Sequence, residues 1–160
     1  MSGAVPDGGV LQLRLLVVDD EPTVCRMLDT FLKKRNALVV TTSSVAHARQ
    51  AVGSGVPFDA MIVDKNLPDG SGLDLLREFS AAGLGVILMT GYPTPEAEAA
   101  VKAHGGIAYL LKPFDLAALD RSLAQAVEFT RNHRFVRQQQ RSVLSTVSEG
   151  ILRHGRTGKS

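Results

Sequence analysis

Two features that would mark special classes of protein are missing from this sequence: paired cysteines and long apolar runs. Cys25 is the only cysteine among the 160 residues, so no disulfide can form within the chain. A lone thiol suits a reducing cytosol, and the apolar residues around Cys25 predict a small buried core residue. No apolar run reaches the ~18 residues that a membrane span needs. The first apolar stretch, residues 10–18, lacks the basic leader and cleavage site of a signal peptide. We therefore expect a cytoplasmic protein.

Charge is modest overall but unevenly distributed. The formal net charge is +2, yet residues 1–120 carry 10 basic and 14 acidic side chains, whereas residues 121–160 carry 8 basic and 2 acidic ones. The two parts are therefore expected to meet different surroundings. Residues 1–10 are rich in glycine and proline without any period, which predicts a flexible N-terminal tail.

Five short apolar runs recur at regular spacing along residues 11–128. They are rich in β-branched residues and mostly apolar on both faces, as in the strands of a covered parallel sheet. The runs cover residues 13–18, 38–42, 58–63, 85–89 and 107–111. Segments with helical period lie between and after them, and Thr94 followed by Pro95 is typical of a helix start. Strict alternation predicts a doubly wound α/β domain over residues 11–128, with a five-stranded parallel sheet and helices on both faces.

Polar residues follow four of the five predicted strands, at the edge where the site of such a sheet lies. These residues are Asp19 and Asp20 (followed by Glu21), then Asp64, Thr90 and Lys112. Three carboxylates this close repel one another without a cation, and oxygen ligands with room for water favour Mg²⁺. Lys112 and Thr90 would supply donors for an anion beside the metal. The arrangement suits phosphoryl transfer with a carboxylate as the nucleophile.

Four motifs, each ending its own strand, resemble in order and spacing the CheY-like receiver domain of two-component response regulators. They are LVVDDEP, DKNLPDGSGLDLL, LMTGY and YLLKPF. Each motif alone is weak, but their conjunction is specific, and the resemblance covers about residues 11–128. It implies a flavodoxin-like strand order, 2-1-3-4-5, and a cis peptide between Lys112 and Pro113.

The resemblance also implies how the acidic residues act. Asp64 would accept a phosphoryl group from a histidine kinase, a phosphotransfer protein or a small phosphodonor. Asp20 and Asp64 would bind Mg²⁺ directly, and Asp19 would act largely through water. The backbone carbonyl of Asn66 would complete the protein ligands.

The remaining site residues would then form the switch. Lys112 would pair with the phosphoryl group, and Thr90 would swing its hydroxyl onto it. Tyr109 would rotate inward as Thr90 moves, and the surface of the fourth helix, fifth strand and fifth helix would repack to control a partner or output domain. Asn66 and Tyr92 flank the site and are expected to tune the phosphoryl lifetime. Such a domain is no enzyme beyond its own phosphotransfer and dephosphorylation.

Three other functions fit the sequence less well. A phosphatase of the haloacid dehalogenase type places a second aspartate two residues after its nucleophile, where this chain has Asn66. A flavin carrier would need a phosphate loop after the first strand, and the acidic DDEP segment would repel phosphate. An unphosphorylated scaffold, or pseudo-receiver, is the runner-up, although such modules usually lack one of the acids, the threonine or the lysine that this chain retains.

Residues 129–160 lie outside the resemblance and predict a basic helical extension. Neither glycine nor proline occurs from residue 116 to residue 149, and Val143, Leu144, Val147 and Ile151 form a short apolar stripe. The extension would serve as a linker, a signalling helix or a dimerising coiled coil, and a solvated, frayed helix is the alternative. A homodimer through the fourth helix, fifth strand and fifth helix is also open. Neither a membrane nor nucleic acid is an expected partner, because so short a segment cannot supply a helix-turn-helix core.

Overall fold

Five parallel strands form the central sheet of the computed structural model, which describes residues 12–134. In chain order they are β1 (Leu13–Val18), β2 (Ala37–Thr42), β3 (Ala60–Asp64), β6 (Val86–Thr90) and β7 (Ala108–Leu111). Their order in the sheet is β2-β1-β3-β6-β7, which confirms the predicted flavodoxin-like arrangement. The sequence did not predict a small antiparallel hairpin after β3, formed by β4 (Asn66–Leu67) and β5 (Gly70–Ser71).

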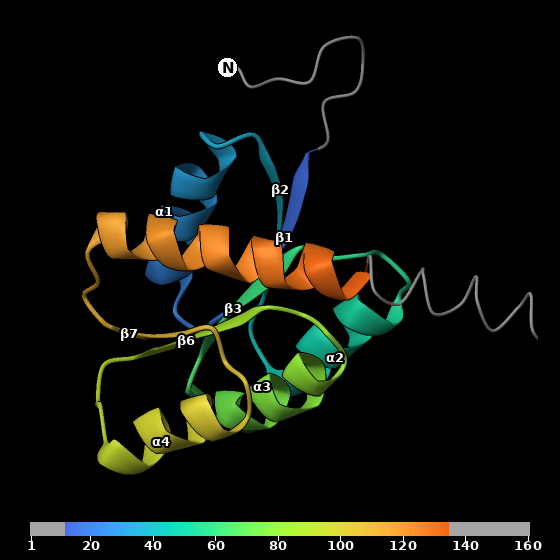
Figure 1. The fold of residues 1–160 in the computed structure, drawn as a ribbon. Helices are drawn as coiled ribbons and strands as arrows, with labels where there is room; N and C mark the ends of the chain where they lie inside the picture. Colours follow the sequence, from blue (N-terminus) through green and yellow to red (C-terminus); the bar gives the residue numbers. More distant parts are fainter. Residues whose placement is uncertain (1–11, 135–160) are drawn as a thin grey trace, which may run out of the picture.

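Helices cover both faces of the sheet, as predicted (Figure 1). One face carries α2 (Val45–Gly53), α3 (Gly72–Ala81) and α4 (Pro95–Ala103). The other carries α1 (Pro22–Lys33) and a C-terminal helix, described here over residues 116–134. None of the helices within residues 12–134 has both the length and the apolar character to cross a membrane. The predicted N-terminal tail and the apolar stripe at residues 143–151 lie outside the described residues.

Short polar side chains begin three of the helices. Ser44, Ser71 and Thr94 each accept a hydrogen bond from a backbone N–H in the first turn of α2, α3 and α4. Each bond satisfies a helix N–H that has no partner within its own helix. The predicted start at Thr94 and Pro95 is confirmed.

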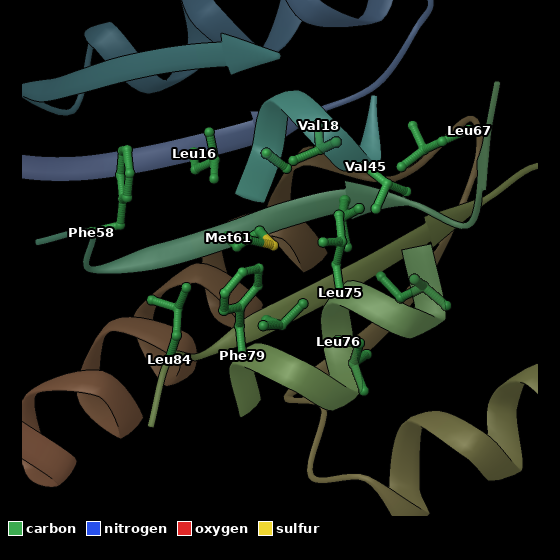
Figure 2. Close-up of a cluster of buried hydrophobic side chains, with 14 of the residues drawn as sticks. Leu16, Val18, Val45, Phe58, Met61, Leu67, Leu75, Leu76, Phe79 and Leu84 are labelled. Atoms are coloured by element: carbon green, nitrogen blue, oxygen red, sulfur yellow. The ribbon is translucent and has the colours of Figure 1, made fainter. Parts of the chain in front are cut away.

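The core consists of two apolar layers, one on each side of the sheet. Along β1, Leu16 and Val18 pack toward α2 and α3, whereas Leu15 and Val17 pack toward α1 and the C-terminal helix. Figure 2 shows the first layer. Burial on both sides explains why the strands are apolar at nearly every position. Each fully buried leucine removes enough apolar surface from water to contribute about 1.5–3 kcal/mol.

Cys25 is less buried than the sequence predicts. It is only partly covered, and its thiol donates to the backbone oxygen of Asp19 at 3.2 Å. Cys25 lies one turn into α1, directly after the polar end of β1, so its position is at the rim of the second layer rather than inside it.

The C-terminal helix is fixed to the sheet edge opposite the strand ends that carry Asp19 and Asp64. The Thr130 hydroxyl oxygen accepts the Gly85 N–H at 2.8 Å, and the hydroxyl donates to the oxygen of Ala126 at 2.9 Å. A side chain at Gly85 would clash with the backbone of Ala126, so only glycine permits this approach. Four residues further along, Arg134 pairs with Asp59 at 2.9 Å. The packing of this helix therefore extends past residue 128, where the sequence analysis places the boundary between the domain and its predicted helical extension.

We expect Thr130→Val to lower the free energy of unfolding by about 1–3 kcal/mol. Valine keeps the shape of threonine but leaves the buried Gly85 N–H without its acceptor. Urea unfolding of wild type and variant measures the difference. Thr130→Ser keeps the hydroxyl and should lose markedly less stability; equal losses in the two variants would contradict a role for this hydrogen bond.

Candidate functional site

Parallel pairing brings the predicted site residues to one edge of the sheet. Asp19 follows β1, Asp64 is the last residue of β3, Thr90 is the last of β6, and Lys112 follows β7. These strands are neighbours in register, with Val18 beside Val63 and Asp64 beside Met89. The cis peptide that the family resemblance implies between Lys112 and Pro113 is present.

Three carboxylates cluster at this edge. Asp19, Asp20 and Asp64 each offer one oxygen, and these oxygens lie within 4.8 Å of one another. Asp19 and Asp64 are buried, whereas Asp20 is exposed. The donor set is all oxygen and opens to solvent at Asp20, which suits a hard divalent cation that keeps some of its water.

Lys112 balances much of this negative charge. Its ammonium donates to Asp19 at 2.7 Å, to Glu21 at 2.8 Å and to Asp64 at 3.2 Å. Burial alone would lower the pKa of Lys112, but the hydrogen bonds to Asp19 and Glu21 outweigh burial and raise its pKa above the usual value. The lysine therefore stays charged. Burial raises the pKa of the Asp19 carboxyl, and the hydrogen bonds from Lys112 and from the Glu21 N–H oppose that rise.

The loop after Asp64 is held in place at both ends. Its Asp69 carboxylate accepts the N–H groups of Val45 and Ala46, at 2.8 and 3.0 Å, which lowers the pKa of Asp69. At the other end the Gly72 N–H donates to the oxygen of Lys65 at 2.7 Å. A side chain at Gly72 would clash with the backbone oxygen of Asp64. The loop that carries Asn66 is thus tied to the starts of α2 and α3.

The two predicted switch residues are held by the loop between β6 and α4. Thr90 is fully buried, and its hydroxyl oxygen accepts the Tyr92 N–H at 3.0 Å. The Tyr109 hydroxyl oxygen accepts the Thr94 N–H at 3.2 Å. The structure thus brings Lys112 into direct contact with Asp19, Glu21 and Asp64. Both predicted switch hydroxyls are instead engaged with backbone groups of residues 92–94.

A cleft of about 730 Å³ opens onto the acidic cluster. Its polar lining includes Asp20, Glu21, Asp64, Asn66 and Lys112. Its apolar lining comes from Val24 and Met27 of α1, from Phe114, and from the exposed ring of Tyr92. Both an anionic group and an apolar contact surface can be accommodated here.

Sequence reasoning gave no role to two residues of this site. Glu21 was noted only as the neighbour of the paired aspartates, yet its carboxylate contacts Lys112. Gly72 was not singled out as a site residue, yet its lack of a side chain permits the close approach to Asp64. The sequence shows only that Gly72 lies eight residues after Asp64. Without the geometry of the loop, this spacing does not predict that the two residues are in contact.

Comparisons with known proteins agree with the fold. Residues 15–124 match the family model described as response regulator receiver domain. The transcriptional regulatory protein FixJ of Azorhizobium caulinodans is 38% identical over 121 residues, which cover 70% of this chain and 56% of FixJ. The response regulator protein PilR of Pseudomonas aeruginosa is 31% identical over 116 residues, covering 71% of this chain and 26% of PilR. The chain therefore spans only part of the length of these relatives.

A solved structure is similar over nearly its whole length. The crystal structure of a response regulator receiver protein from Pseudomonas putida aligns with a TM-score of 0.67 and 30% identity. The alignment covers 72% of this chain and 98% of that one. The segment in common is thus the α/β domain.

We expect Asp20→Asn to raise the free energy of unfolding without divalent cations, because it removes one of three repelling charges. The gain should be about 1 kcal/mol or less, since Asp20 is exposed to water. Added Mg²⁺ should stabilise wild type more than the variant and so shrink the difference. Thermal unfolding with and without Mg²⁺ measures both effects. Glu128→Gln, on the exposed side of the C-terminal helix, is the control; an Asp20→Asn protein less stable than wild type without Mg²⁺ would contradict this account.

Proposed function

The chain belongs to the response regulator receiver domain family, and from that premise we propose that it is a signalling switch phosphorylated on Asp64. The observation that carries this proposal is the arrangement around Asp64. Its carboxylate is buried beside two further aspartates and accepts a hydrogen bond from the Lys112 ammonium. A nucleophilic carboxylate, a charge-neutralising lysine and a cation site together meet the needs of phosphoryl transfer.

The acids fit a magnesium ion. Asp20 and Asp64 would bind it directly, Asp19 largely through water, and the backbone carbonyl of Asn66 would complete the protein ligands. When bound, the ion would neutralise charge on the phosphoryl oxygens. The open side of the cluster at the exposed Asp20 leaves room for the waters that Mg²⁺ retains.

The protein's own groups perform the remaining chemistry. An Asp64 carboxylate oxygen forms a bond to the phosphorus of a donor phosphohistidine, and the phosphorus–nitrogen bond breaks as the imidazole leaves. The Lys112 ammonium, already 3.2 Å from Asp64, neutralises charge on the transferred group. Thr90 then adds its hydroxyl as a further donor. The chain catalyses nothing beyond this transfer and the later hydrolysis.

The proposed switch follows from the hydrogen bond that the Thr90 hydroxyl must break. Its hydroxyl has to turn from the Tyr92 N–H toward the phosphoryl group. As Thr90 moves, Tyr109 rotates inward and leaves the Thr94 N–H at the start of α4. The loop between β6 and α4 would therefore rearrange, and with it the surface of α4, β7 and the C-terminal helix. That surface would control an output domain, a partner protein or a second copy of this chain.

The partners follow from the cleft and from the relatives. A histidine kinase or phosphotransfer protein would present its phosphohistidine in the cleft, against the apolar side chains of Val24, Met27 and Phe114. Relatives such as FixJ are named as transcriptional regulators and are longer than the matched segment. An output attached to, or contacted by, this chain would work in the cytoplasm beside its kinase.

We expect wild type, incubated with Mg²⁺ and acetyl phosphate, to gain the mass of one phosphoryl group in intact-protein mass spectrometry. Asp64→Asn should gain none, because the amide is not a nucleophile. Asp74→Asn, an exposed carboxylate in the first turn of α3, should be modified like wild type. Beryllofluoride binding provides the parallel test. A wild type that is neither phosphorylated nor binds beryllofluoride, or an Asp64→Asn variant that does either, would refute the proposal.

Tyr92 is 79% exposed at the mouth of the cleft. We expect Tyr92→Ala to shorten the lifetime of the phosphorylated protein, because a smaller side chain admits water to the aspartyl phosphate more readily. The decay of phosphorylated protein after removal of the donor measures this rate. Equal decay rates in wild type and variant would remove Tyr92 from the residues that set the lifetime.

A further inference from the structure

Glu21 contributes a carboxylate to the site that neither the cation nor the phosphoryl chemistry uses. It stands outside the cluster of Asp19, Asp20 and Asp64 that could hold a metal. Its side chain is 59% exposed, yet one carboxylate oxygen lies 2.8 Å from the Lys112 ammonium. The distance from the same ammonium to the buried Asp19 is 2.7 Å, and the distance to Asp64 is longer, at 3.2 Å.

The direction of the Glu21 side chain is notable because of its place in the fold. Glu21 is the residue that caps the N-terminus of α1, where a side chain usually accepts a helix N–H. Here the side chain makes no such bond and instead contacts Lys112. Pro22 follows at the first helical position and has no N–H to offer.

The backbone of Glu21 is fixed from both sides. Its N–H donates to Asp19 at 2.9 Å, and its carbonyl oxygen accepts the Cys25 N–H at 3.2 Å. Lys112 is held in the same way, because its N–H donates to the oxygen of Thr90 at 2.8 Å. Any rearrangement between Glu21 and Lys112 is therefore a rotation of side chains alone.

The ammonium of Lys112 has no donor to spare. It carries three N–H groups, and three carboxylates accept from it. Phosphorylation turns the Asp64 carboxylate into an acyl phosphate, so the N–H that Lys112 now donates to Asp64 can pass to the phosphoryl oxygens. A second N–H can reach these oxygens only if Lys112 gives up its bond to Asp19 or its bond to Glu21. Asp19 is fully buried and already holds the backbone of Glu21, so losing Lys112 would cost its carboxylate more than the same loss would cost an exposed one. Glu21 is the exposed partner, and water can replace Lys112 at its carboxylate.

We propose that Glu21 is a positioning residue that holds the Lys112 ammonium in the resting state and releases it to the phosphoryl group. This inference rests on the function proposed for Asp64 and Lys112. Glu21 acts on the reaction only through Lys112. Its bond stabilises the resting state and is lost in the phosphorylated one, so Glu21 sets the balance between them.

Beryllofluoride affinity in the presence of Mg²⁺ tests this role in three variants of the full chain. Glu21→Ala removes the contact and the charge, and Glu21→Gln removes the charge but keeps the reach. Glu21→Asp keeps the charge but is one methylene shorter, and aspartate at this position favours the cap of α1 over Lys112. Glu21→Ala and Glu21→Asp should both bind beryllofluoride about 2- to 5-fold more tightly than wild type, the range expected for losing an exposed ion pair.

The aspartate variant decides the outcome. If Glu21→Asp binds beryllofluoride like wild type, or more weakly, the role of Glu21 is one of charge alone and the inference is overturned. The same holds if Glu21→Ala does not tighten binding. Glu21→Gln should fall between wild type and Glu21→Ala; a Gln variant that matches Ala while Asp still tightens supports the inference. Thermal unfolding confirms that each variant is folded. Failure of wild type to bind beryllofluoride would instead refute the proposed function of Asp64.

Discussion

The site depends on one electrostatic constraint: parallel strands end at the same edge, so acids at their ends must share a small volume. Asp19 and Asp64 are buried there and Asp20 lies beside them. Without positive charge the three carboxylates would repel one another strongly in a partly desolvated place. Lys112, directly after the fifth strand of the sheet, supplies that charge through bonds to Asp19 and Asp64. A site of this kind is kept at some expense of stability, which is common where function requires like charges to be close.

The rest of the fold holds this edge still. Two apolar layers fix the register of the strands, so the strand ends cannot slide relative to one another. The loop after Asp64 is tied to α2 through Asp69 and to α3 through the close approach at Gly72. Of the three carboxylates that Lys112 contacts, only that of Glu21 is exposed to water. Charged side chains on a fixed backbone form an arrangement in which a small chemical change can redirect specific hydrogen bonds.

Much of this structure could be predicted because burial and topology leave marks in the sequence. Burial on both faces makes the strands continuously apolar, and parallel pairing gathers their polar end residues, so Asp64, Lys112 and the acids were predicted together. The contact of Glu21 with Lys112 could not be predicted, because a residue at a helix start is expected to cap that helix. Cys25 was predicted to be buried since its neighbours are apolar, but sequence does not show how near α1 starts to the polar rim. The role of Gly72 could not be predicted either, because its close approach to Asp64 depends on the geometry of the loop.

The C-terminal helix has a mechanical consequence. Its residues 116–134 begin four residues after Lys112 and reach the opposite edge of the sheet, where Thr130 and Arg134 are bound. At 1.5 Å per residue this is a rod of about 28 Å. Leu119, Leu123 and Ala126 bury one side of this rod against the sheet. The helix therefore spans the sheet as one stiff element, from the edge that carries Lys112 to the edge where Thr130 is bound.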